Sequence, residues 1–482
     1  MKKLYGMLTA ILLAIPLFAP GGAAQGEVPP NILFIAVDDL KPLTGWYGSE
    51  TVKTPAFDRL ASQSTVFTAA YTQYPVCGPS RASLLTGLRP ESSGIMDLKT
   101  RMRDIHPDIL TLPQFFRNNG YHTAAVGKIF DPRNVDSRDD DDPASWTIPY
   151  KQSLPDADRK LEDNFAVRSI DAPPGRFIDG AINARGIELM HKMAAKNEPF
   201  FLGVGYKKPH LPFAAPSRFF DLYDRESFGL EAWQTAPEGS DASYILMGNN
   251  EMRSYVPAPG PDGKVIEYSP EGMTEEQQRE LIHGYHAAVS FIDYLLDELL
   301  QELEATGEAD NTIIVLWGDH GFHLGDHGMW GKHTTMEQAN RVPLMIHVPG
   351  EKGAYTSTLV ELMDLFPTLA QLAGLEAPGN LQGKSLAPVL KDASFDFGDV
   401  AISQYKRKGA YGYSMRTDRY RYTEWIMDDG RVAYRDLYDM QEDPGETRNI
   451  GDLPENEELM DSLAALLRQN SKGMKRLIKS KT

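Results

Sequence analysis

Two runs of apolar residues, far apart in the chain, each end in acidic residues. Residues 31–37 precede the adjacent aspartates Asp38 and Asp39, and residues 312–317 precede Gly318, Asp319 and His320. Uninterrupted apolar runs of this length are typical of strands that are buried on both faces of a parallel sheet. Because ligands of open α/β sheets bind at the carboxyl edge of the strands, we expect these polar residues to mark a functional edge.

Further apolar runs alternate with amphipathic stretches along most of the chain. We expect strands at residues 121–126, 199–205 and 343–348. We expect helices at residues 55–62, 111–118, 177–195, 275–303 and 359–372. This alternation predicts an α/β fold with a wound central sheet flanked by helices, and we assign residues 25–375 to this main domain.

The pattern changes after about residue 376. Residues 412–416 and 420–425 are separated by Thr-Asp-Arg and indicate an antiparallel hairpin. Residues 434–438 are consistent with another strand, and residues 455–469 with a final helix. We therefore expect residues 376–482 to form a smaller C-terminal α+β subdomain with a small antiparallel sheet.

Charge and cysteine content exclude several classes of protein. The 482 residues carry a net charge of −18, which argues against a nucleic-acid partner, so an anionic substrate would need a local cationic pocket. The single cysteine, Cys77, excludes an intramolecular disulfide and a multi-cysteine metal site. Residues 136–142 are rich in aspartate but lack the spacing and the glycine of a calcium-binding loop, so we expect a solvated loop there.

The first 24 residues have the three parts of a signal peptide. Lys2 and Lys3 form a basic start, residues 8–18 are apolar, and residues 22–24 are small. The apolar run is too short to span a membrane, and no other stretch is long enough. We expect residues 1–24 to be removed from an exported protein, periplasmic or secreted, without a membrane span; an uncleaved anchor is the alternative.

The acidic residues at the two strand ends have the chemistry of a hard cation site. Asp38, Asp39 and Asp319 suit Ca²⁺ or Mg²⁺, which prefer oxygen ligands, whereas His320 is a less typical ligand. From these residues alone, acids that cap helix starts after the strands are an equally good interpretation.

The segment around Cys77 favours the metal interpretation. Residues 77–81 read Cys-Gly-Pro-Ser-Arg, and residues 86–87 read Thr-Gly. This pattern is the formylglycine signature of type I sulfatases; a lone cysteine packed as a small hydrophobe is the alternative. A helix that starts here would turn free backbone N–H groups toward an anion at residue 77. The chain therefore resembles the sulfatases of the alkaline-phosphatase superfamily and, more narrowly, their iduronate-2-sulfatase branch.

The resemblance covers nearly the whole chain after residue 31. Motifs of the family occur in the expected order at residues 37–40, 127–130, 208–213, 318–321, 330–332 and 439–446. It implies an alkaline-phosphatase-like fold and hydrolysis of sulfuric esters. It also implies that a formylglycine-generating or equivalent maturation enzyme oxidises Cys77. The hydrated aldehyde would then attack sulfur, carry the sulfate as a hemiester and release it.

The resemblance also assigns roles to other residues of this chain. One Ca²⁺ would be bound by Asp38, Asp39, the modified residue 77, Asp319 and His320. Arg81 would orient the hydrated aldehyde, Lys128 and Lys332 would bind the sulfate oxygens, and His210 would protonate the leaving oxygen.

One position departs from the family pattern. Asp131 stands where the family usually has a histidine, three residues after Lys128, and an aspartate donates a proton only if its pKa is strongly raised. The closest implied substrate is the 2-O-sulfate of a uronic acid in a sulfated, glycosaminoglycan-type oligosaccharide. Algal polysaccharide fragments such as ulvan or carrageenan are an alternative substrate. Hydrolysis of phosphonate monoesters or phosphodiesters on the same fold is an alternative reaction.

Overall fold

The central sheet dominates the computed structural model, which describes residues 29–135, 141–150, 154, 156–162, 165–246, 251–257, 272–471 and 474. Its strands follow the order β11-β2-β10-β7-β1-β5-β3, with β12 also paired to β2. Their bounds are β1 (Asn31–Val37), β2 (Thr65–Tyr71), β3 (His122–Gly127), β5 (Phe200–Tyr206), β7 (Thr312–Gly318), β10 (Arg341–His347), β11 (Ala354–Thr356) and β12 (Val360–Glu361).

The sheet is mixed. β1 runs parallel to β5 and β7, and β5 runs parallel to β3. β10 is antiparallel to both β7 and β2, so β2 again points in the direction of β7. The five strands expected in this sheet are confirmed. The expected wound α/β architecture is confirmed as well.

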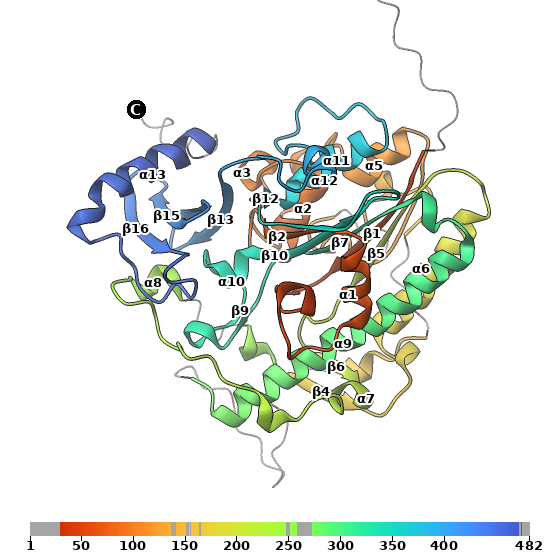
Figure 1. Ribbon diagram of the computed structural model, residues 1–482, viewed down its shortest axis with the longest axis horizontal. Helices are drawn as coiled ribbons and strands as arrows, with labels where there is room; N and C mark the ends of the chain where they lie inside the picture. Colours follow the sequence, from red (N-terminus) through yellow and green to blue (C-terminus); the bar gives the residue numbers. More distant parts are fainter. Residues whose placement is uncertain are drawn as a thin grey trace, which may run out of the picture.

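Helices cover both faces of the sheet (Figure 1). Alternate residues of β1 pack into two different cores, because successive strand side chains point to opposite faces. One core contains α1 (Pro55–Ser62), α6 (Ile178–Ala194) and α9 (Glu275–Thr306). The other contains α2 (Cys77–Thr86), α5 (Leu112–Asn118), α11 (Leu365–Leu372) and α12 (Ala387–Lys391).

The longest predicted helix is confirmed, whereas another begins later than expected. α9 starts with a capping box between Thr274 and Gln277 and ends at Gly307, whose φ of 79° is left-handed. The helix predicted from residue 359 is wrong over its first residues. There, Val360 and Glu361 pair with β2 as β12, and a 3-10 helix at Leu362–Asp364 leads into α11.

A second sheet, built by the C-terminal part of the chain, is separate from the first (Figure 1). Its antiparallel order is β13 (Ala401–Arg407), β14 (Ala410–Arg416), β15 (Tyr420–Met427) and β16 (Val432–Asp439). α13 (Glu457–Asn470) packs on it. The predicted hairpin and final helix are confirmed. Arg421 of this sheet forms ion pairs with Glu337 and Glu446, and these three side chains are buried.

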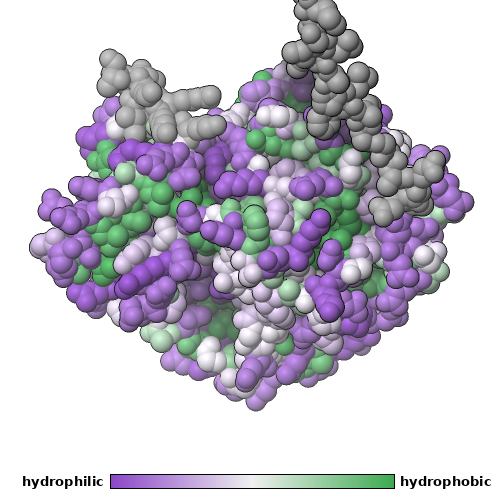
Figure 2. All heavy atoms as spheres, turned by 45° about the horizontal axis from the view of Figure 1, so that its top comes forward, coloured by the Kyte–Doolittle hydropathy of each residue, from purple (hydrophilic) through white to green (hydrophobic). Residues whose placement is uncertain are grey.

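Shorter elements connect these layers. They are α3 (Pro90–Ser93), α4 (Met102–Ile105), α7 (Ser217–Phe220), α8 (Ala242–Ile245), α10 (Glu337–Asn340), β4 (Val167–Ile170), β6 (Phe213–Pro216), β8 (His323–Leu324) and β9 (Trp330–Gly331). Among the described residues, no helix has the length and apolar character that a membrane crossing needs. The face drawn in Figure 2 is mainly hydrophilic, with hydrophobic residues in separate patches.

Two sequence predictions concern segments that lie wholly or partly outside the described residues. Residues 1–24, predicted to be a signal peptide, and residues 136–140 lie outside the described residues. For Asp141 and Asp142 the prediction of a solvated loop is wrong, because both are buried. Arg103 binds Asp142 at 2.5 and 2.8 Å, and the Trp146 indole donates to Asp141 at 3.2 Å.

Candidate active site

The carboxyl edge of the sheet collects the polar residues that follow neighbouring strands. Val37 lies opposite both Tyr206 and Gly318, so the residues after β1, β5 and β7 emerge side by side. β3 ends in register with β5 and delivers Lys128 to the same edge. Gly127 is required at that end, because a Cβ there would lie 2.1 Å from the Gly205 carbonyl oxygen.

Four potential metal ligands lie within reach of one ion. Ligand atoms of Asp38, Asp39, Cys77 and His320 all lie within 4.8 Å of one another, and all four residues are buried. Asp319 adjoins them, with Oδ1 3.6 Å from His320 Nε2. A donor set rich in carboxylate oxygens fits a hard divalent cation such as Ca²⁺.

The backbone at this cluster is constrained. Asp39 has a φ of 62°, in the left-handed region that a non-glycine residue enters at a cost. Its N–H donates to Asp319 Oδ1 at 3.1 Å, which joins the ends of β1 and β7. Its carbonyl oxygen accepts a hydrogen bond from the Tyr285 hydroxyl of α9 at 2.6 Å. These contacts hold the Asp39 carboxylate at the edge.

Three buried cations balance the carboxylates. Arg81 donates to Asp319 at 2.9 Å and to Asp38 at 3.1 Å, and its side chain has no exposed surface. Lys128 lies 2.6 Å from Asp38, and Lys332 lies 2.7 Å from Asp39. Burial acts to raise the pKa of Asp38, but Lys128 and Arg81 outweigh it and hold the pKa well below its ordinary value. Asp38 therefore stays ionised.

Cys77 is the first residue of α2, at the centre of this arrangement. Its Sγ lies 3.2 Å from His320 Nε2. The expected helix start is confirmed, yet burial and then the charge of Asp38 raise the pKa of the thiol well above its ordinary value. Because the thiolate is the nucleophilic form of cysteine, the unmodified side chain is poorly suited to attack a substrate.

His210 and Glu251 both lie next to Asp39 at this edge, although no sequence motif indicated Glu251. The His210 Nδ1 lies 2.7 Å from the Leu211 carbonyl oxygen, which fixes the ring and leaves Nε2 to face the site. Glu251 lies 2.8 Å from Lys332 and 3.9 Å from His210 Nε2. Its Oε2 is buried and has no hydrogen-bond partner among the described residues. Glu251 follows no strand and belongs to no recognised motif, so no sequence signal points to it.

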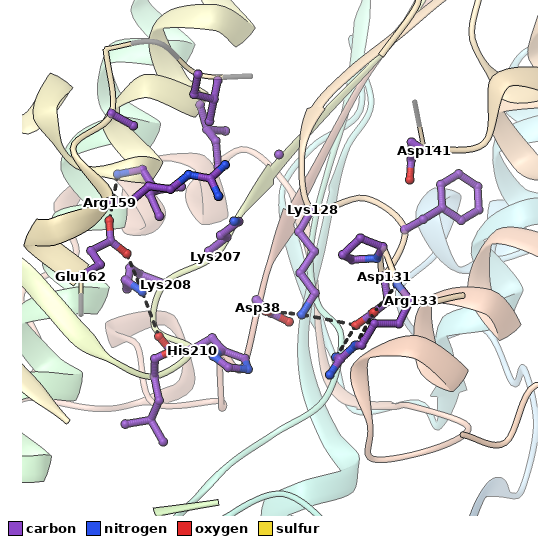
Figure 3. Close-up of a pocket in the computed structure, with 18 of the residues that line it drawn as sticks. Asp38, Lys128, Asp131, Arg133, Asp141, Arg159, Glu162, Lys207, Lys208 and His210 are labelled. Atoms are coloured by element: carbon purple, nitrogen blue, oxygen red, sulfur yellow. Dashed lines mark hydrogen bonds and ion pairs between the residues drawn. The ribbon is translucent and has the colours of Figure 1, made fainter. Parts of the chain in front are cut away.

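A pocket of about 510 Å³ opens beside these residues. Asp38, Lys128 and His210 form part of its wall, as Figure 3 shows. Its other charged residues are Asp131, Arg133, Asp141, Arg159, Glu162, Lys207 and Lys208. The pocket thus supplies local positive charge in a chain of net charge −18, as an anionic substrate requires.

Asp131, the departure from the family pattern, is paired rather than free. Its carboxylate accepts two hydrogen bonds from the Arg133 guanidinium, at 2.8 and 2.7 Å, and lies 3.7 Å from Lys128. Burial acts to raise the pKa of Asp131, but its hydrogen bonds with Arg133 and the charge of Lys128 lower it below the ordinary value. Asp131 is therefore a carboxylate and does not replace a histidine as a proton donor.

The structure brings together all nine residues predicted for the site, and their chemical roles stay predictions. They are Asp38, Asp39, Cys77, Arg81, Lys128, His210, Asp319, His320 and Lys332. Sequence reasoning missed Glu251 and three cations of the pocket wall, Arg133, Arg159 and Lys207, which belong to no recognised motif.

Comparison with solved structures identifies the class of fold. A structure of a protein in complex with its substrate D-glucosamine-2-N,6-O-disulfate has a TM-score of 0.75 at 24% identity, covering 93% of this chain and 98% of that one. Together, the mixed sheet, the acidic cluster at its edge and the second sheet define an α/β protein of the alkaline-phosphatase-like fold.

Comparison of sequences then identifies the family. The family model described as Sulfatase matches residues 30–375, and the one described as N-sulphoglucosamine sulphohydrolase, C-terminal, matches residues 325–473. Iduronate 2-sulfatase of Mus musculus is 33% identical over 92% of this chain and 94% of its own length. Iduronate 2-sulfatase of Homo sapiens is 34% identical over 82% of this chain and 85% of its own length. The chain belongs to the sulfatase family and is a sulfuric ester hydrolase.

Proposed function

We propose that this sulfatase removes the 2-O-sulfate of a uronic acid in a glycosaminoglycan-type oligosaccharide. The observation that carries the proposal is the position of Cys77, buried against His320 and the carboxylates beside a cationic pocket. The similarity to two iduronate 2-sulfatases over most of the chain supports the choice of substrate.

In this proposal residue 77 works as formylglycine. A maturation enzyme converts the cysteine, and the hydrated aldehyde supplies an oxygen nucleophile in place of a thiol whose pKa is raised by burial. As the first residue of α2, residue 77 lies beside the polar residues that follow β1 and β7. Arg81, one turn later on α2 and fully buried, positions the neighbouring carboxylates.

One Ca²⁺ would be held by Asp38, Asp39, residue 77, Asp319 and His320. When bound, the ion would offset negative charge on the nucleophile and on the sulfuryl oxygens. Lys128, directly after β3, and Lys332, directly after β9, reach this cluster from different parts of the fold. They would bind sulfate oxygens, since buried ammonium groups stabilise developing negative charge strongly. His210 Nε2 would carry the proton to the leaving sugar oxygen.

We also propose that the protein is exported, to the periplasm or the medium, on the basis of residues 1–24. Such a compartment would bring it into contact with sulfated oligosaccharides from outside the cell. Expression with and without these residues, followed by fractionation, tests this: a shortened protein that still leaves the cytoplasm contradicts it.

The proposed reaction is tested by offering matched esters to the purified enzyme. We expect an aryl sulfate to be hydrolysed much faster than the corresponding aryl phosphate, and a 2-O-sulfated uronic acid disaccharide to release sulfate. Faster turnover of the phosphate or phosphonate ester would overturn the sulfatase assignment. Preference for ulvan or carrageenan fragments would keep the reaction and replace the substrate. Cys77→Ala serves as the inactive control.

A further inference from the structure

The charged residues of the pocket do not all pair with one another. Three of its acids are matched by nearby cations: Asp38 by Lys128, Asp131 by Arg133 and Glu162 by Lys208. Lys207 and Arg159 also line the pocket, but among the described residues neither has a carboxylate within ion-pair distance. The surplus positive charge therefore lies on the wall that these two residues share.

A buried ion pair ties the two segments of this wall together. Lys208 lies 3.0 Å from Glu162, and both side chains are only 3% exposed. Glu162 ends the 3-10 helix that begins with Arg159, and it also accepts the backbone N–H of Ile178 at 2.8 Å. The Lys208–Glu162 pair thus holds the helix that carries Arg159 against the segment that carries Lys207.

The backbone of Lys207 is fixed as well. Asp179, near the start of α6, accepts hydrogen bonds from the backbone N–H groups of Lys207 at 2.6 Å and of Lys208 at 3.2 Å. Lys207 follows directly after β5, which lies between β1 and β3 in the sheet. It is therefore a neighbour of the residues that follow those strands, Asp38 and Lys128.

The position of this wall suits a ligand that already has one anionic group at Lys128. Figure 3 shows Lys207 between Arg159 and Lys128, with Arg133 on the other side of Lys128. The pocket of about 510 Å³ that these residues line is large enough for one or two sugar rings. A cation fixed by its backbone and without an internal partner recognises an external anion at little cost in side-chain order.

We propose that Lys207 and Arg159 form a second anion subsite, which binds the carboxylate of a uronic acid while its sulfate ester lies at Lys128. This inference rests on the proposed function, because it assumes that a sulfate ester occupies the reacting end of the pocket. It predicts that the enzyme selects substrates by a second negative charge.

The test compares Lys207→Gln and Arg159→Gln with Lys160→Gln. Lys160 is the exposed neighbour of Arg159 on the same 3-10 helix and does not line the pocket. Each variant is assayed on a 2-O-sulfated uronic acid disaccharide, on its carboxyl methyl ester and on an aryl sulfate. For the free acid we expect Lys207→Gln to lower kcat/KM by about tenfold, as loss of a charge-assisted hydrogen bond does. For the methyl ester and the aryl sulfate we expect smaller losses.

The outcomes separate this inference from the proposed function. Equal losses of kcat/KM on the free acid and on the methyl ester would overturn the carboxylate subsite. A loss of kcat/KM that depends on a second sulfate of the substrate, and not on its carboxylate, would also overturn it. Lys160→Gln should match the wild type on all three substrates. Failure of the wild type to hydrolyse any sulfate ester would refute the proposed function itself. Thermal unfolding of each variant checks the fold, and Arg159→Gln changes an exposed residue, so folding cannot mask its result.

Discussion

Replacing Lys128 by methionine removes a cation from the reacting end of the pocket. Its Nζ lies 2.6 Å from Asp38 and 3.7 Å from Asp131, and its side chain is 10% exposed. Burial acts to lower the pKa of Lys128, but Asp38 and residue 77 raise it above the ordinary value, so the group is charged. Loss of one such stabilising group typically costs about 2.7–4 kcal/mol in the transition state, so we expect kcat to fall by about 10²–10³-fold.

The fold should tolerate this change better than catalysis does. Asp38 keeps Arg81 at 3.1 Å, and Asp131 keeps Arg133 at 2.7 Å, so neither carboxylate is left alone. The free energy of unfolding should therefore fall by less than the roughly 3–5 kcal/mol of a fully orphaned buried charge.

Steady-state kinetics on an aryl sulfate, together with urea unfolding, measure both effects. Lys160→Met is the matched control, because it removes the ammonium of an exposed lysine outside the pocket. A Lys128→Met variant that is folded and keeps kcat/KM within about threefold of the wild type, or about 0.7 kcal/mol, would refute the role given to this lysine.

Three further predictions concern other parts of the site and the fold. Asp131→Asn should release Arg133 and lower kcat/KM for the sulfated disaccharide; retention of Arg133 in a crystal structure with unchanged kinetics would contradict this. Treatment with a calcium chelator should abolish activity and lower the Tm, and added Ca²⁺ should restore both; a chelated enzyme with full activity would exclude the metal. Asp293 accepts the Phe57 N–H at 2.8 Å, and burial raises its pKa to about 7. Its contribution to stability is thus present at low pH and lost as the pH rises toward 7, with a slope of up to about 1.4 kcal/mol per pH unit. Asp293→Asn should flatten this dependence in unfolding curves, and an unchanged profile would contradict the assignment.

The sequence was informative wherever a single strong pattern fixed a position. Residues 31–37 are buried on both faces and end at the site, as their uninterrupted apolar character predicts. By contrast, β2 and β13 carry threonine, serine and other polar residues, so their pattern did not separate them from loops. β12 is a two-residue strand that owes its conformation to pairing with β2, a tertiary effect that no local pattern contains.

The same contrast holds for the site. A short motif placed Cys77 and Arg81 on one helix, and buried strands placed Asp38 and Asp319 at one edge. The partners of these residues come from irregular segments: Glu251 contacts Lys332, and Arg133 contacts Asp131. Whether a charged side chain is paired or open to a ligand depends on distances between such segments. For that reason only the three-dimensional arrangement shows that Lys207 has no carboxylate within ion-pair distance among the described residues.

The central claim is that residue 77 acts as an oxidised side chain. Mass spectrometry of the peptide that contains it, from preparations of known specific activity, tests this most directly. The account predicts that activity rises in proportion to the fraction of peptide in which the CH₂SH group has become an aldehyde. Full activity in a preparation whose residue 77 is entirely an unmodified thiol would contradict it.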